Sequence, residues 1–245
     1  QSTTMLLQAK ALKGLGKRQE ALLVLTDVLA VDKDYIEAQL ELSDLYMELN
    51  ELDKALSVLN QILKAHLLNS SYLSKRAVIH IAKQDFTSAN KDLALLYSIQ
   101  SKEPSSLLRL AYLQREAKNL EAALKSINTA IQLSPNEYIY QRERARLLLQ
   151  TSDLPEARKQ IAALEKLFVM TADTRLLLGD LAIAEQDFTN ATKHYHNAVV
   201  KQSNFVQALV KRYNMARSGY GGTEFIELFE SILQDNSSTD FARNL

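Results

Sequence analysis

The feature that most constrains the fold is an alanine that recurs every 34 residues without a gap. This column consists of Ala21, Ala55, Ala89, Ala123, Ala157 and Ala191. A second column of small residues stands twelve positions before it: Ala9, Ser43, Ala77, Ala111, Ala145 and Gly179. Bulky apolar residues, such as Leu25 and Leu59, follow the alanines by four positions. Because these offsets are helical, the pattern predicts an array of repeated helical units.

Short polar stretches separate the two small columns, for example Lys83-Gln84-Asp85. We interpret them as tight turns between two helices. Antiparallel helices approach closely where one of them presents a small side chain to the bulky residues of the other, which explains both columns. A single hairpin cannot bury its two apolar faces, so each pair is expected to stack on the next and extend one core.

The best matching units resemble the tetratricopeptide repeat (TPR) family, whose pattern is W-x2-L-G-x2-Y, A-x3-F and P on a 34-residue period. One unit carries Leu42, Ser43, Tyr46, Ala55 and Leu59, and another carries Leu110, Ala111, Ala123, Ile127 and Pro135. The resemblance implies an all-α fold, a right-handed superhelical solenoid of antiparallel helix pairs with about seven repeats. The sequence departs from the family pattern at the tryptophan position, which holds Met5, Gln39, Leu73, Leu107, Gln141 and Arg175.

The frame divides the chain into six regular repeats, one degenerate repeat and a short remainder. The regular repeats are expected at 2–35, 36–69, 70–103, 104–137, 138–171 and 172–205. The seventh, 206–238, has Tyr213 and Phe225 where small residues belong and a turn at Gly219-Tyr220-Gly221-Gly222. Residues 239–245 are expected to begin a truncated helix.

Composition and motifs argue against catalysis and against several classes of ligand. The 29 basic and 29 acidic residues balance, which disfavours nucleic acid, and no apolar run reaches the roughly 18 residues of a membrane span. The absence of cysteine excludes disulfides and thiolate chemistry. His194 and His196 point to different sides of a helix and cannot share a metal. We therefore expect no enzyme activity, no cofactor and no metal, unless a catalytic domain lies outside this sequence.

The resemblance implies that the first helix of each repeat lines a concave groove that binds partners. The expected contact residues are Leu108, Tyr112, Arg115, Arg142, Arg146, Leu149 and Asp180. Their arginines have two interpretations: an anion site for an acidic partner segment, or internal pairing with Glu116, Asp173 and Asp180. The Lys-x-x-x-Asn pattern of the chaperone-tail-binding members is missing from the first helices, which disfavours a co-chaperone role.

Three polar residues are expected to be structural. Arg76 and Arg144 stand at helix crossings, where their stems should pack and their charged heads should reach solvent. His80 should pack inside its hairpin with a hydrogen bond.

Two functions remain open. The first is a protein-binding scaffold whose groove holds a peptide or helical segment of a partner, and the second is a module that forms homo-oligomers by end-to-end stacking.

A second resemblance concerns one short segment of the seventh repeat. This segment, Lys211-Arg212-Tyr213-Asn214 with the glycine-rich turn after it, resembles bacterial repeat proteins of exopolysaccharide export and PEP-CTERM sorting. That resemblance favours the periplasm or cell envelope over the cytoplasm. Because the chain opens at Gln1, an upstream targeting signal is left open.

Overall fold

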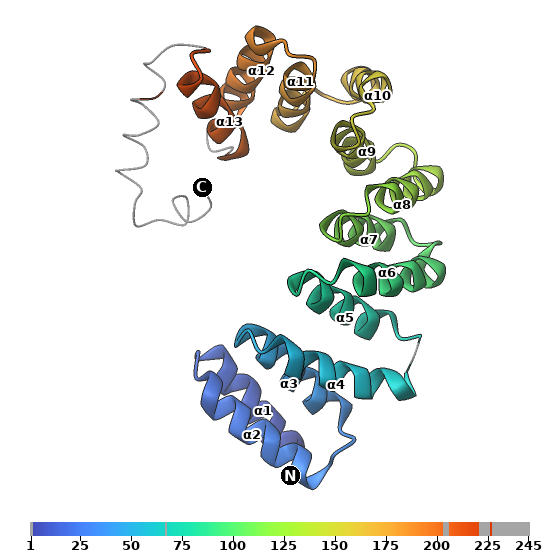
Figure 1. The fold of residues 1–245 in the computed structure, drawn as a ribbon, viewed down its shortest axis with the longest axis vertical. Coiled ribbons are helices and arrows are strands. Elements are labelled where there is room, and N and C mark those ends of the chain that lie inside the picture. Colours follow the sequence, from blue (N-terminus) through green and yellow to red (C-terminus); the bar gives the residue numbers. More distant parts are fainter. Residues whose placement is uncertain (1, 67, 203–205, 221–225, 227–245) are drawn as a thin grey trace. The chain divides into compact units, whose positions relative to one another are not determined.

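Thirteen helices and no strand make up the secondary structure of the residues that the computed structural model describes, which are 2–66, 68–202, 206–220 and 226 (Figure 1). The expected all-α class is therefore confirmed. The helices are α1 (Ser2–Gly14), α2 (Arg18–Val31), α3 (Ile36–Glu48), α4 (Leu52–Ala65), α5 (Ser70–Ala82), α6 (Phe86–Gln100), α7 (Pro104–Glu116), α8 (Leu120–Leu133), α9 (Tyr138–Gln150), α10 (Leu154–Leu167), α11 (Ala172–Ala184), α12 (Phe188–Lys201) and α13 (Val206–Arg217).

The chain forms two compact units, residues 1–129 and 130–245, and α8 crosses the division. In the first unit α1 pairs with α2, α3 with α4, and α5 with α6, and each second helix also contacts the first helix of the following pair. The second unit repeats this scheme with α9 and α10, α11 and α12, and then α13. Neighbouring first helices also contact each other, in the pairs α1 with α3, α5 with α7, and α9 with α11. Each unit is therefore built from two helical layers.

Helix positions follow the period of the sequence. The first helices begin at residues 2, 36, 70, 104, 138, 172 and 206, and the second helices begin at 18, 52, 86, 120, 154 and 188. The exact repeat limits drawn from the sequence stay predictions. The seventh repeat beyond Tyr220, with Gly221, Gly222 and Phe225, lies outside the described residues apart from Ile226, as does the helix expected at 239–245.

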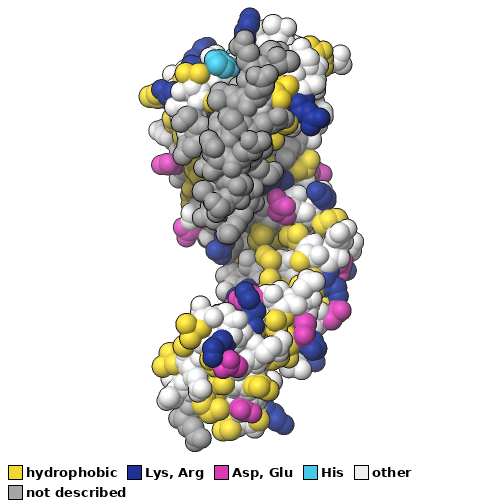
Figure 2. Space-filling view, turned by 90° about the vertical axis from the view of Figure 1, so that its left-hand side faces the viewer, with side chains coloured by type: hydrophobic (Ala, Val, Ile, Leu, Met, Phe, Trp, Pro, Cys, Tyr) yellow, Lys and Arg dark blue, Asp and Glu magenta, His cyan; other side chains and the backbone are white. Residues whose placement is uncertain are grey.

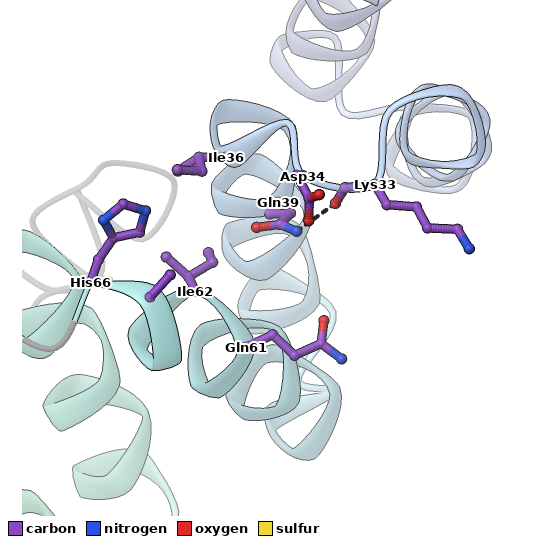
Figure 3. Close-up of a pocket in the computed structure, with 8 residues that line it drawn as sticks. Lys33, Asp34, Ile36, Gln39, Gln61, Ile62 and His66 are labelled. Atoms are coloured by element: carbon purple, nitrogen blue, oxygen red, sulfur yellow. Dashed lines mark hydrogen bonds between the residues drawn. The ribbon is translucent and has the colours of Figure 1, made fainter.

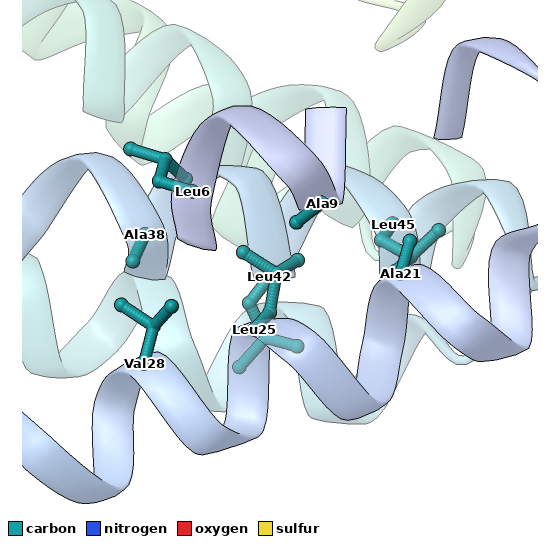
Figure 4. Close-up of a cluster of buried hydrophobic side chains, with 8 residues drawn as sticks. All are labelled: Leu6, Ala9, Ala21, Leu25, Val28, Ala38, Leu42 and Leu45. Carbon is teal, nitrogen blue, oxygen red and sulfur yellow. The ribbon is translucent and has the colours of Figure 1, made fainter. Parts of the chain in front are cut away.

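Small residues at the helix crossings form the centre of the core. All six alanines of the first column are fully buried. Figure 4 shows the crossing in the first repeat, where side chains from α1, α2 and α3 converge. This cluster consists of Leu6, Ala9, Ala21, Leu25, Val28, Ala38, Leu42 and Leu45. Because α3 completes a core that α1 and α2 begin, each hairpin depends on the next for burial of its apolar face.

The turn inside each hairpin depends on one residue in the left-handed region. In the second repeat Asn50 has φ 59°. Its N–H donates to the carbonyl of Met47 at 3.0 Å, and the N–H of Glu51 donates to that of Tyr46 at 2.8 Å. This is the Schellman arrangement, which satisfies the last carbonyls of the first helix. In four later turns the following residue accepts a backbone N–H and caps the second helix: Asp85, Asn119, Asp153 and Asp187.

Candidate functional site

The expected contact residues occupy three equivalent positions on consecutive first helices, spaced i, i+4 and i+7. On α7 these positions hold Leu108, Tyr112 and Arg115, all half-buried. One period later, on α9, they hold Arg142, Arg146 and Leu149, also half-buried, and α11 adds Asp180. The α7 face belongs to the first unit, and the α9 and α11 faces belong to the second.

On α7 an arginine lies over an aromatic ring. The guanidinium carbon of Arg115 is 5.3 Å from the ring centroid of Tyr112, within the range of a cation–π contact. The same guanidinium reaches Glu116 Oε1 at 3.4 Å. With Leu108 one turn before Tyr112, the α7 face combines an aliphatic, an aromatic and a cationic group.

On α9 a network of polar groups holds Arg142 from both sides. Its NH1 lies 3.3 Å from Asp173 Oδ1 on α11, and its guanidinium carbon lies 6.0 Å from the ring of Tyr138. The Tyr138 hydroxyl hydrogen-bonds the hydroxyls of Thr171 at 2.7 Å and Thr174 at 2.9 Å. The Nε of Arg142 makes no hydrogen bond within the described part of the chain. The guanidinium is therefore held in place, and its unused Nε donor is buried, which leaves its terminal nitrogens for a ligand.

Arg146 lies one turn further along α9 and pairs with a buried carboxylate. Its NH1 is 3.3 Å from Glu143 Oε2, and the Glu143 side chain is only 1% exposed. Burial of an ionised carboxylate is unfavourable without such a partner. Arg146 thus contributes to folding, while about a quarter of its side chain stays exposed (26%).

Asp180 is held by groups that the sequence interpretation did not pair with it. It accepts a hydrogen bond from the hydroxyl of Tyr195 at 2.8 Å and one from Lys211 Nζ at 2.6 Å. Burial, followed by the negative charge of Asp180, raises the pKa of Tyr195 well above its ordinary value. Asp180 therefore ties α11 to α12 and α13 and is not a partner of the α9 arginines.

Ion pairs between consecutive first helices recur at a sequence separation of 31 residues, and sequence reasoning largely missed them. They place a cation and a carboxylate opposite each other along the expected binding face. Figure 2 shows one face of the chain, on which Lys and Arg side chains are interspersed with Asp and Glu side chains. The pairs are Lys10 with Glu41 and Asp44 with Lys75 in the first unit, and Arg142 with Asp173 and Asp180 with Lys211 in the second.

Three tetratricopeptide repeat models match the sequence, over residues 12–79, 104–137 and 142–204, and together they account for more than half of the chain. The chain belongs to the tetratricopeptide repeat family. A comparison with curated proteins gives no match. No helix among the described residues combines the length and apolarity needed to cross a membrane.

Solved TPR structures share this fold. A TPR protein from Parabacteroides merdae is 22% identical with a TM-score of 0.56, over 88% of this chain and 84% of that chain. The protein pilF of Pseudomonas aeruginosa is 15% identical with a TM-score of 0.57, over 89% and 97%. YrrB, a TPR protein with an unusual peptide-binding site, is 17% identical with a TM-score of 0.52, over 76% and 95%. At these identities the similarity concerns the fold, and it confirms the expected TPR solenoid.

The arginines at the crossings of these TPR hairpins bind buried acceptors. Arg76 donates to both oxygens of Asp92, through Nε at 2.8 Å and NH2 at 2.6 Å, and Arg144 donates to Gln160. These contacts agree with the expected structural role: a polar partner stands sixteen residues later at each crossing, while the Arg76 and Arg144 side chains stay 24% and 28% exposed. His80 is mostly buried as expected, but its Nδ1, 3.3 Å from Asp85 Oδ2, makes no hydrogen bond among the described residues.

Proposed function

We propose that the chain is a non-catalytic scaffold that binds an extended or helical segment of a partner protein on its first helices. Membership in the TPR family supports this general role. The α7 and α9 faces support it further, because they carry half-buried tyrosine and arginine, two of the residue types enriched in binding hot spots. YrrB, whose fold is similar, has a peptide-binding site.

The observation that carries the proposal is the arginine pair on α9. Arg142 and Arg146 are one helical turn apart on the same face, and their side chains are 19% and 26% exposed. Asp173 and Glu143 hold them in place, so a ligand need not order two flexible side chains. Guanidinium groups bind carboxylates well, and Leu149 offers an apolar contact beside them. The partner of this face is thus an acidic segment with apolar residues.

The other expected contact residues receive separate roles. Leu108, Tyr112 and Arg115 on α7 form a second contact face in the first unit, which is to be tested by itself. Asp180, although tied to Tyr195 and Lys211, adds negative charge on α11 and disfavours binding of an acidic segment there.

A charge-reversal experiment tests the α9 face. Acidic–hydrophobic peptides selected from a display library on the parent chain should bind the Arg142→Glu, Arg146→Glu double variant at least about 2 kcal/mol more weakly, or about 30-fold. Binding to the parent should also weaken as salt rises, since partly exposed charges are screened. Isothermal titration calorimetry at two salt concentrations measures both effects.

The matched control makes the same change of charge on another surface. Arg158 and Lys159 on α10 are 68% and 74% exposed, so their double replacement by Glu changes the net charge equally without touching the α9 face. This control should bind peptide as the parent does. If the α9 double variant keeps its circular dichroism spectrum and also binds like the parent, Arg142 and Arg146 are internal counter-ions only.

A second candidate function, self-assembly by end-to-end stacking, rests on uncharged side chains along one face of the first repeat. Thr4, Leu7, Gln8 and Ala11 on α1, with Leu15 in the turn after it, are exposed, Leu7 at 62% and Leu15 at 73%. At four of the five equivalent positions of the next repeat, α3 and its turn pack on the first repeat with Ala38, Leu42, Leu45 and Leu49. The α1 face thus has the character of a stacking surface. Sedimentation velocity of the parent and of a Leu7→Glu, Leu15→Glu variant tests it, because stacking predicts growth with concentration only in the parent.

A more specific role, in assembly of a bacterial envelope or exopolysaccharide export complex, is also a proposal. It rests on the sequence segment from Lys211 to Asn214 and the turn that follows. In the structure this segment lies within α13, where Arg212 is buried.

A further inference from the structure

A cavity of about 460 Å³ lies in the first unit at the open end of the second hairpin, between the start of α3 and the end of α4. Figure 3 shows Ile36, Ile62 and His66 around one space, with Gln39 beside them, while the Lys33 side chain points away. Among the described residues, Asp34, Gln61 and Ala65 also line it. This volume falls within the range of small-ligand pockets. None of the residues that line it belongs to the proposed contact faces on α7 and α9.

The fifth repeat shows what occupies the equivalent place when it is filled. Three periods after Ile36 and His66 stand Tyr138 and Phe168, whose rings meet edge to face with centroids 5.3 Å apart. The second repeat has an aliphatic residue and a smaller ring at these positions, so it lacks this aromatic pair; His66 instead contacts the ring of Tyr72 edge to face, with centroids 6.1 Å apart. The hairpin end of this chain is therefore suited to aromatic rings.

The surrounding framework is the same in both repeats. Gln39 Nε2 donates to the carbonyl of Lys33 at 2.6 Å, and its equivalent Gln141 donates to the carbonyl of Pro135 at 2.7 Å. Because this bond fixes the amide of Gln39, its Oε1 is held beside the cavity as an acceptor. Ile36, Ile62 and Ala65 supply apolar walls of the cavity.

We propose that this cavity binds the side chain of a tryptophan or tyrosine from a partner protein. An aromatic ring fills the apolar part of the space, and its N–H or O–H donates to Gln39 Oε1. Such a side chain satisfies both the walls and the acceptor, whereas a leucine or phenylalanine side chain leaves the acceptor unused. The site lies on α3 and α4 of the first unit and goes beyond the proposed α9 face in the second.

Fluorescence tests this proposal directly, because the chain contains no tryptophan. N-acetyl-tryptophanamide excited at 295 nm should show a saturable blue shift on titration with the chain, with a dissociation constant on the order of 1 mM. N-acetyl-tyrosinamide should compete, and N-acetyl-leucinamide should compete at least about tenfold more weakly. Absence of a saturable shift overturns the proposal.

The matched variant transfers the aromatic pair of the fifth repeat into the second. Ile36→Tyr with His66→Phe should fill the cavity and weaken binding of N-acetyl-tryptophanamide at least about tenfold. Gln141→Leu and the Arg142→Glu, Arg146→Glu variant should bind it as the parent does, which separates this site from the α9 face. Binding by the filled variant within twofold of the parent, with an unchanged circular dichroism spectrum, contradicts the proposal.

If the filled variant does not fold, the parent chain still decides the question. In methyl NMR spectra, the signals of Ile36 and Ile62 should shift with N-acetyl-tryptophanamide along the same saturation curve as the fluorescence. Unshifted signals for these two residues at saturation overturn the site.

Discussion

At the scale of single residues, Gly179 in the sixth repeat shows how one crossing differs from the rest. The column holds alanine or serine in the other regular repeats, and the residue sixteen positions later is leucine or isoleucine. In the sixth repeat that residue is Tyr195. A Cβ on Gly179 would lie 2.3 Å from Tyr195 Cε1, closer than any ordinary contact. The ring cannot move away freely, because it is buried and its hydroxyl is bound to Asp180.

We therefore expect Gly179→Ala to lower the free energy of unfolding by about 1–3 kcal/mol, the usual cost of overpacking a core. Gly14→Ala is the control, since a Cβ there has no neighbour within 4 Å, and it should change stability by less than about 1 kcal/mol. In a Tyr195→Ile background, Gly179→Ala should cost less, because the crossing then resembles that of the fourth repeat. Urea denaturation compares the parent with these two single variants, with Tyr195→Ile and with the double variant, and a Gly179→Ala variant as stable as the parent contradicts the packing argument.

At the scale of helices and turns, each regular hairpin places one turn residue at a positive φ, and in most hairpins that residue is not glycine, so the backbone is strained there. The left-handed position is glycine in the first repeat, with Gly16 at φ 76°. In the next five repeats it is Asn50, Gln84, Lys118, Ser152 and Gln186, with φ between 59° and 62°. A side chain in this region costs roughly 1–2 kcal/mol per residue, apart from glycine and, to a lesser degree, asparagine.

Gln84→Gly should accordingly raise the free energy of unfolding by about 0.5–1 kcal/mol, because relief of strain exceeds the added flexibility of the unfolded chain. Gln84→Ala is the matched control: it removes the same side chain but keeps a Cβ at φ 60°, so it should give no gain. Thermal unfolding of the three proteins compares them. A stabilised alanine variant would show that the glutamine side chain, and not backbone strain, is the unfavourable element.

The turns also show what the sequence can and cannot predict about the elements. Their positions were predictable, because close packing requires a small residue at each crossing and so marks both helices of every pair. The left-handed conformation of Gln84 and Lys118 was not predictable, because neither glutamine nor lysine is typical of a positive φ. The Schellman hydrogen bonds impose that conformation on whatever residue follows the first helix.

At the scale of the whole molecule, the candidate site was only partly predictable. The period locates the face of each first helix, so Arg142 and Arg146 were expected on one side of α9. Internal pairing of Arg142 with Asp173 was one of the two interpretations, and the structure shows that contact. The pairing of Asp180 with Lys211 could not be foreseen, because it depends on the angle between neighbouring helices and on rotamers. The cavity at Ile36 likewise depends on side-chain packing that a column of residue types does not contain.

Hydrogen bonds and charges lower the pKa values of several carboxyl groups, so the stability of the fold should fall at acid pH. Hydrogen bonds from Ser88 lower the pKa of Asp85, and hydrogen bonds from Asn190 lower that of Asp187. Burial opposes ionisation of Glu41, but hydrogen bonds and charge from its lysine partners, led by Lys13, outweigh it and lower its pKa as well. A carboxyl whose pKa is lower in the folded chain stabilises the fold above its unfolded pKa, which is about 3.9 for Asp and 4.3 for Glu. That contribution is lost as the pH falls through the folded pKa.

The thermal midpoint should therefore be insensitive to these groups between about pH 5 and pH 8 and should fall below about pH 4. Replacing Asp85 and Asp187 by Asn separates the cause, because the chain already uses Asn119 as an equivalent cap, which accepts the N–H of Ala122 at 3.1 Å. The double variant should keep its caps but lack two titrating groups, so its midpoint should fall less steeply than that of the parent between pH 5 and pH 3. Circular dichroism melts across this range measure the slopes. Equal slopes would mean that the acid sensitivity arises in other carboxylates, such as Glu41, and that the turn caps act through hydrogen bonding alone.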